Sequence, residues 1–197
     1  MRTDQDLIQG IKNHDSGLFE EFVRRFQQPV YFTALRMVGN RNDALDMAQE
    51  VFLKVWRYAS KLPDTVILER WVYRVTINSC IDRLRSDRNH YRKQKMDNIV
   101  ILSLIEPGMN PREYAHRIEE LNQVKQALAE LTERQRAIFV LRHFQNLKMQ
   151  EISEILSIPL GTVKATLHQT FCKLKGLMRS LPGEDESQHS DSSCSIG

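Results

Sequence analysis

The feature that most constrains the fold is a two-faced helical pattern between Glu69 and Lys95, ERWVYRVTINSCIDRLRSDRNHYRKQK. At 100° per residue, one arc of this helix is apolar and the neighbouring arc is basic. The apolar arc consists of Tyr73, Ile77, Cys80, Ile81 and Leu84. The basic arc consists of Arg74, Asn78, Arg85 and Arg92. Such a helix packs one side into a core and leaves the other in water.

Trp71 lies beside the basic arc, where its ring can stack on an unpaired base. Cations along one side of a helix with an aromatic ring at their edge suit single-stranded nucleic acid. The alternative is an ordinary amphipathic helix with a solvated basic face and a Trp in the core. The pattern of this stretch alone leaves both interpretations open.

The composition favours helices over a turn-rich β protein, because the 197 residues include only 8 Gly and 6 Pro. The length allows one or two domains, each with its own core. A net charge of only +3 means that any contact with nucleic acid must come from local patches. We therefore expect an all-α protein.

Several functional classes lack their signatures here. The three cysteines, Cys80, Cys172 and Cys194, lie far apart and the six histidines are scattered, so we expect no disulfide framework, no metal site and a reducing cytoplasm. We find no apolar run of about 18 residues, and expect no membrane insertion. There is no P-loop, nucleophile elbow or HExxH motif, so we expect no catalytic residues, no cofactor and no enzyme activity.

The N-terminal part reads as a series of capped helices. Thr3 is a candidate cap for a short first helix, and Asp15 or Ser16 for the next. Apolar residues then recur at helical spacing from Leu18 to Val38, with a kink or break allowed at Pro29. The turn after Val38 offers Asn42 as the cap of a third helix.

That third helix, DALDMAQEVFLKVWRYA, has two faces of different character. The spacing predicts one buried stripe made of Leu45, Ala48, Phe52, Val55 and Ala59. A second face is acidic at one end and apolar at the other, and consists of Asp46, Gln49, Glu50 and Leu53. It is either a docking surface for a basic partner or a solvated exterior with acids near the helix N-terminus.

The charge and apolar patterns predict two domains. Residues 1–94 form the first, 95–116 a flexible linker with two Pro stops, 117–181 the second, and 182–197 a disordered Ser-rich tail. In the second domain Thr132 and Gln135 form a capping box. Two helices then flank the tight turn Ser157-Ile-Pro159.

Two short helices joined by such a turn are typical of a helix-turn-helix, whose second helix enters the major groove. We place it at about Met149 to His168. Its outward side chains, available to phosphates and base edges, are Thr162, Lys164, Thr166, His168 and Gln169. The alternative is a plain helical hairpin whose outward polar side chains are only solvated.

Three motifs in order resemble the extracytoplasmic-function (ECF) sigma factors, small two-domain members of the sigma-70 family. DALDMAQEVFLKVW resembles the region 2 helix that binds polymerase, and RWVYRVTINSCIDRLR resembles the promoter-melting helix. The segment from LTERQRAIF to TVKATLHQTFCKLK resembles region 4, with its helix-turn-helix. The resemblance covers about Leu18 to Leu181 and implies a helical region 2 domain and a helical region 4 domain.

The resemblance also implies partners and roles. Core RNA polymerase would be bound through the clamp of its largest subunit and the flap of the second, with Leu45, Asp46, Gln49, Glu50 and Leu53 on the clamp. Trp71, Arg74, Asn78 and Arg85 would contact the minus-ten element, and the loop from Lys61 to Leu68 would hold an extruded base. Thr162, Lys164, Thr166, His168 and Gln169 would read the minus-35 element. Control by an anti-sigma factor is implied as well.

One departure from the family pattern concerns the recognition helix. Relatives place Arg after GTVK and about one turn later, whereas Ala165, Thr166, Gln169 and Phe171 stand here. Arg is the usual bidentate reader of guanine, so we expect an unusual minus-35 preference or weaker upstream anchoring.

The alternative function is a stand-alone regulator that binds duplex DNA without polymerase. Such a regulator would use the helix-turn-helix but not the Asp46, Gln49 and Glu50 face.

Overall fold

The computed structural model describes residues 2–62, 66–86, 128 and 130–179. In these ranges the chain is helical and has no strand, which confirms the all-α prediction. The helices are α1 (Asp4–Lys12), α2 (Ser16–Val38), α3 (Arg41–Tyr58), a 3-10 turn η1 (Ala59–Lys61), α4 (Leu68–Ser86), α8 (Glu133–His143), α9 (Met149–Leu156) and α10 (Leu160–Arg179). The predicted linker 95–116, the tail 182–197 and Arg92 lie outside the described residues.

Most helix starts follow from the capping residues in the sequence. Thr3 and Asp6 form a capping box at α1, and the Asp15 side chain accepts from the Leu18 backbone N–H at α2. Thr132 and Gln135 form the predicted capping box at α8. These side chains satisfy backbone donors that the first helical turn leaves unpaired.

Two details of the first domain differ from the sequence prediction. The cap of α3 is Asn40, not Asn42, because Gly39 ends α2 in the left-handed conformation and turns the chain at once, with Asn40 accepting from the Asp43 N–H. Leu45 is not part of the buried stripe and is 44% exposed. The buried stripe is Ala44, Met47, Val51 and Val55, with Ala48 and Phe52 half-buried beside it. Pro29 lies within α2 without ending it.

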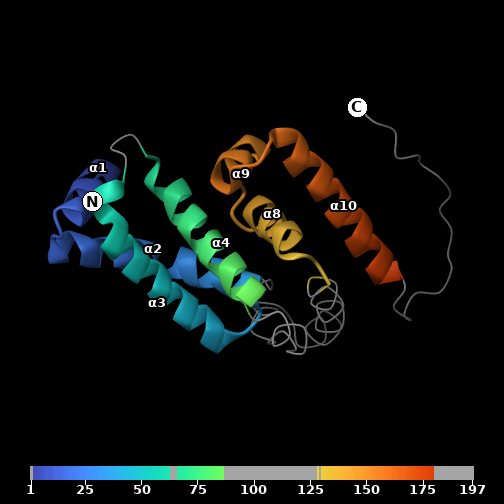
Figure 1. Ribbon diagram of the computed structural model, residues 1–197, viewed down its shortest axis with the longest axis horizontal. Helices are drawn as coiled ribbons and strands as arrows, with labels where there is room; N and C mark the ends of the chain where they lie inside the picture. Colours follow the sequence, from blue (N-terminus) through green and yellow to red (C-terminus); the bar gives the residue numbers. More distant parts are fainter. Residues whose placement is uncertain (1, 63–65, 87–127, 129, 180–197) are drawn as a thin grey trace, which may run out of the picture.

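The four N-terminal helices pack around a core in which α2 is central. α1 packs on the N-terminal end of α2, α3 runs along α2, and α4 packs along both α2 and α3 (Figure 1). The core side chains of this part include Phe22, Phe26, Val51, Val55, Leu68 and Val72. The apolar arc predicted for α4 is buried at Tyr73, Ile77, Cys80 and Leu84.

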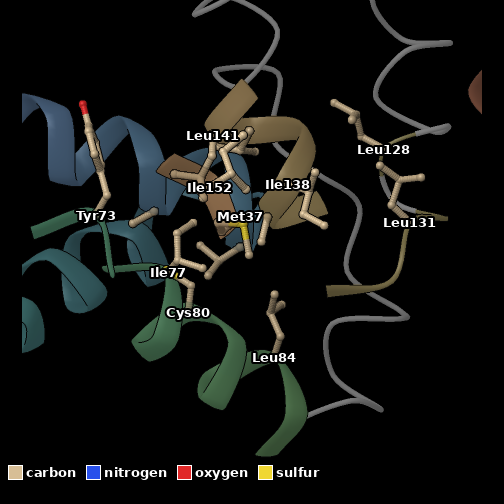
Figure 2. Close-up of a cluster of buried hydrophobic side chains, with 14 of the residues drawn as sticks. Met37, Tyr73, Ile77, Cys80, Leu84, Leu128, Leu131, Ile138, Leu141 and Ile152 are labelled. Carbon is tan, nitrogen blue, oxygen red and sulfur yellow. The ribbon is translucent and has the colours of Figure 1, made fainter. Parts of the chain in front are cut away.

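The C-terminal part, α8 to α10, packs directly against α2 and α4. α8 and α9 lie between α4 and α10 (Figure 1). Figure 2 shows Ile77 and Leu84 of α4 facing side chains of the C-terminal part, among them Ile138 and Ile152, in one shared apolar cluster. The two helical parts predicted from the sequence are therefore present, and in this structure their cores are continuous.

The helix-turn-helix is formed by α9, the turn Ser157–Pro159 and α10. Ser157 ends α9 in the left-handed conformation, with φ 52° and ψ 47°. Ile152, Ile155, Val163 and Leu167 bury the inner sides of the two helices. Within the described residues, no helix combines the length and apolar character needed to cross a bilayer.

Close packing of α1 on α2 generates a stability prediction at Gly10. A Cβ atom at this position would lie 2.3 Å from Leu18 Cδ1 and 2.4 Å from Leu18 Cβ. We expect Gly10→Ala to lower the free energy of unfolding by about 1–3 kcal/mol, because the two helices must move apart. Urea denaturation followed by circular dichroism measures the change.

The matched control is Gly176→Ala in α10, where nothing lies within 4 Å of the added Cβ. It should be neutral or stabilising by up to about 1 kcal/mol, because Ala is the better helix former. Equal effects of the two substitutions would contradict the packing argument.

Candidate functional site

The first candidate surface is the outer side of α3. Leu45 and Leu53 are large apolar side chains with 44% and 54% of their surface exposed. Asp46 and Gln49 are exposed between them, and Glu50 is partly exposed. The structure thus brings all five residues predicted for polymerase binding onto one surface, here called the α3 face. Exposed leucines beside carboxylates suit a partner that offers both cations and apolar area.

The α3 face is connected to α4 through Lys54. The Lys54 ammonium lies 2.6 Å from Glu50 Oε1 and donates to Ser79 Oγ at 2.9 Å. Glu50 and Lys54 are one helical turn apart, and their side chains are 44% and 34% exposed. The ammonium therefore joins a carboxylate of the α3 face to a hydroxyl on α4.

The second candidate surface is the basic side of α4. Arg74, Asn78 and Arg85 are exposed, and Trp71 is half-buried beside them. Of the loop predicted to hold an extruded base, residues 63–65 lie outside the described ranges. At its start, the Lys61 ammonium lies 5.5 Å from the centroid of the Tyr58 ring.

A cavity of about 210 Å³ opens between α3 and α4. Trp71, Tyr58 and Val75 supply its apolar wall, and Tyr58 is 52% exposed. Its polar groups come from Lys54, Asn78, Ser79 and Asp82. We call it the α3–α4 cavity. Its aromatic wall and hydrogen-bonding groups suit a flat heterocyclic ring.

Among the residues that line this cavity, Trp71 and Asn78 are predicted from the sequence as DNA-binding residues, whereas Lys54 and Tyr58 are not. Both come from the last turns of α3, which the sequence connects to α4 only through the loop after Lys61. The available signal was weak: Lys54 and Tyr58 are four residues apart and so share a side of α3. Their position opposite Trp71 depends on how α3 packs on α4.

The third candidate surface is the outer side of α10. Lys164, His168 and Gln169 are exposed, and Thr162 and Thr166 are half-buried. The inner side is held by Val163, Leu167 and Thr170, whose hydroxyl donates to the Thr166 carbonyl at 2.7 Å. Phe171 is 44% exposed and meets the His143 ring edge-on, with the two ring centroids 5.1 Å apart.

Contacts between the two parts reach the basic side of α4. Arg70 pairs with Glu151 at 2.6 Å and with Glu154 at 3.0 Å, both on α9. The Tyr73 hydroxyl donates to Gln145 Oε1 at 2.7 Å. A second cleft of about 180 Å³ has Asn78 and Arg85 on the α4 side and Arg134, Leu156 and Ile158 on the other. The far end of the α4 surface thus faces the helix-turn-helix.

Burial controls the two titratable groups on the inner side of α4. It raises the pKa of the Cys80 thiol to about 12 and also raises the pKa of Tyr73, with a smaller contribution from Glu69. Both groups are therefore protonated at neutral pH. In the described part of the chain, no three His, Cys, Asp or Glu side chains gather to hold a metal ion.

Comparison with protein families matches both parts of the chain. Residues 22–90 match the model of sigma-70 region 2, and residues 121–174 match that of sigma-70 region 4. The first range contains the α3 face, the α3–α4 cavity and the basic side of α4. The second contains the helix-turn-helix.

Similar proteins span the whole arrangement. RNA polymerase sigma factor SigV of Bacillus subtilis is 31% identical over 160 residues, covering 81% of this chain and 90% of SigV. ECF RNA polymerase sigma factor SigW of the same organism is 28% identical over 179 residues, covering 88% of this chain and 96% of SigW. The chain belongs to the ECF sigma factors of the sigma-70 family, a family of transcription initiation factors.

Solved structures show the same fold. CnrH, in complex with the cytosolic domain of CnrY, superposes with a TM-score of 0.65 at 19% identity, over 90% of this chain and 97% of that one. RpoE of Bartonella quintana, in complex with the anti-sigma factor NepR, gives a TM-score of 0.59 at 17% identity, over 82% and 97%. At these identities the likeness concerns the fold.

Proposed function

We propose that this protein binds core RNA polymerase, directs it to a specific class of promoters and stabilises the opened strand. The observation that carries the proposal is the pairing, within one helical body, of the α3 face with the α3–α4 cavity. One surface is suited to a protein partner and the other to an unpaired base. Polymerase supplies the chemistry of nucleotide addition, and this chain acts without catalytic residues of its own.

The α3 face is the proposed site for the polymerase clamp. Leu45 and Leu53 offer apolar area that the fold itself leaves in water. Asp46 and Glu50 supply the charge that a basic coiled coil would complement, and Gln49 adds hydrogen bonds. In such an interface the apolar anchors contribute most of the affinity, and the charges contribute orientation and association rate.

The basic side of α4 and the α3–α4 cavity form the proposed minus-ten site. Arg74 and Arg85 neutralise backbone phosphates, and Trp71 and Asn78 meet bases. Unstacking a base costs a few kcal/mol. Stacking on an aromatic side chain offsets about 1–3 kcal/mol of that cost for each captured base. The cavity therefore favours the open strand over the duplex.

The helix-turn-helix is the proposed minus-35 reader, with Thr162, Lys164, Thr166, His168 and Gln169 toward DNA and the polymerase flap beside it. We propose residues 1–94 and 117–181 as the two domains, and 95–116 as a flexible linker between them. Tethering makes the second DNA contact effectively intramolecular, so modest affinity at each element suffices. Family matches in both domains favour this function over a duplex-only regulator.

Two further features of the proposal concern regulation and location. Both structural relatives described above were solved in complex with a second protein, which for RpoE is the anti-sigma factor NepR. We propose that an anti-sigma factor also controls this chain. We propose a cytoplasmic location, where the polymerase and the promoters are.

The experiment that tests the proposed function is polymerase binding. Asp46→Lys with Glu50→Lys should lower the affinity for core polymerase by at least about tenfold, because like charges would then face each other. Affinity is measured by fluorescence anisotropy of the labelled full chain. Glu20→Lys on α2, where the Glu20–Arg24 pair is well exposed, serves as the control and should bind normally. Unchanged affinity of the double variant would contradict the assignment.

Arg74→Ala with Asn78→Ala should impair open-complex formation more than closed-complex binding, because these residues meet the unpaired strand. Permanganate footprinting reports the opened thymines, and gel shift reports total binding. Arg24→Ala removes a cation of α2 that is 70% exposed and should leave both unchanged. An equal loss at both stages would indicate duplex contacts instead.

Thr166→Arg should strengthen binding to minus-35 duplex and steepen its salt dependence. One added phosphate contact changes the slope of log K against log salt by about 0.9. Gln5→Arg adds the same charge on α1, far from α10, and should change the slope much less. A slope unaffected by Thr166→Arg would show that this position does not face DNA.

A further inference from the structure

Lys54 occupies a position shared by two proposed binding surfaces. It lies on α3, lines the α3–α4 cavity and contacts Glu50 of the α3 face at 2.6 Å. Its ammonium also donates to Ser79 Oγ at 2.9 Å, and Ser79 is a buried residue of α4. The same cation is thus within reach of a polymerase-binding carboxylate and of the cavity proposed to receive a base.

The charges around the cavity show which ligand group Lys54 would meet. Asp82 lines the cavity, and Glu50 adjoins it through Lys54. Two carboxylates against one ammonium disfavour a phosphate at this point. The apolar wall of Trp71, Tyr58 and Val75 instead accepts a ring. Lys54 is therefore placed to donate a hydrogen bond to a carbonyl or ring nitrogen on the edge of a base.

Glu50 limits that donation in the free protein. At 2.6 Å the carboxylate holds the ammonium in a close ion pair, and Ser79 Oγ accepts a hydrogen bond from the same ammonium. A basic surface that binds Glu50 would weaken its hold on Lys54. The ammonium would then keep its contact with Ser79 and have more of its charge available to the cavity.

We propose that Lys54 is a positioning residue for the captured base and that Glu50 restrains it until polymerase binds. Docking of the clamp on the α3 face and capture of a base between α3 and α4 are thereby coupled through one side chain. The proposal rests on the proposed function of these two surfaces. It adds a link that makes the free factor a weaker binder of single strands than the polymerase-bound factor.

An i to i+4 ion pair on a half-exposed helix surface is ordinarily a small stabilising contact without a role in binding. Two observations separate Lys54 from that case. Its ammonium bonds across to a different helix, and it lines a cavity with aromatic walls. The Glu20–Arg24 pair on α2 has the same spacing with side chains 76% and 70% exposed, and provides a matched comparison.

A double-mutant cycle in the full-length free protein tests the coupling. The probe is fluorescein-labelled oligothymidylate about 20 nucleotides long, because thymine offers carbonyl acceptors and stacking tolerates any base. Glu50→Gln should tighten binding about threefold to tenfold, since it releases Lys54 while keeping the side-chain shape. Lys54→Met should weaken binding less than twofold in the wild-type background and should abolish the gain in the Glu50→Gln background.

Non-additivity is the signature of the proposal. If Glu50→Gln acted only by removing negative charge, Lys54→Met would weaken binding by the same factor in both backgrounds, and that result would overturn the proposal. Lys54→Arg should retain most of the gain, because it keeps a donor cation. The parallel cycle of Glu20→Gln with Arg24→Met should be additive.

The polymerase-bound form gives a second readout. With saturating core, Lys54→Met should shorten the lifetime of the open complex severalfold while leaving affinity for core within about twofold. Loss of core affinity without a change in lifetime would mean that Lys54 belongs to the clamp interface only.

Arg74→Ala in the free protein separates failure of this proposal from failure of the proposed function. If Arg74→Ala leaves oligothymidylate binding unchanged, the minus-ten assignment itself fails. If Arg74→Ala weakens binding and the cycle is additive, only the role of Lys54 fails.

Discussion

Burial of one side of α4, with the adjacent side left in water, is the constraint on which the rest of the structure depends. Ile77, Cys80 and Leu84 enter a shared apolar cluster, while Arg74 and Asn78 stay exposed. The same packing sets Trp71 opposite the end of α3 and forms the α3–α4 cavity. A rotation of α4 by one residue would bury cations and destroy the cavity, so the core packing also fixes the surface proposed to contact DNA.

Local features of the fold could be predicted from the sequence because their causes are local. The caps at Thr3, Asp15 and Thr132 depend on side chains within three residues of the donors that they satisfy. The helix-turn-helix and the two faces of α4 follow from helical periodicity. The all-α fold could be predicted for the same reason, because helical periodicity is a local property of the sequence.

Other features depend on packing that the sequence pattern does not contain. Leu45 has the spacing of a core residue, but α2 and α4 bury the neighbouring stripe of α3 through Ala44 and Met47. Asn42 is a plausible cap, yet the left-handed Gly39 starts α3 earlier. Contacts between distant residues were beyond reach as well. The Lys54–Ser79 hydrogen bond joins residues 25 apart, and the Arg136–Met37 hydrogen bond joins residues 99 apart.

The contact between α9 and α4 sets a geometric condition on the proposed binding of two promoter elements. Elements centred near minus ten and minus 35 lie about 25 base pairs apart, or roughly 85 Å along duplex DNA. With α8 and α9 between them, α4 and α10 are separated by about two helix layers, or roughly 20 Å. A body this short cannot straddle both elements. If α4 and α10 contact these two elements as proposed, the N-terminal and C-terminal parts must separate before the protein can span a promoter, and the Arg70 pairs with Glu151 and Glu154 break when they do.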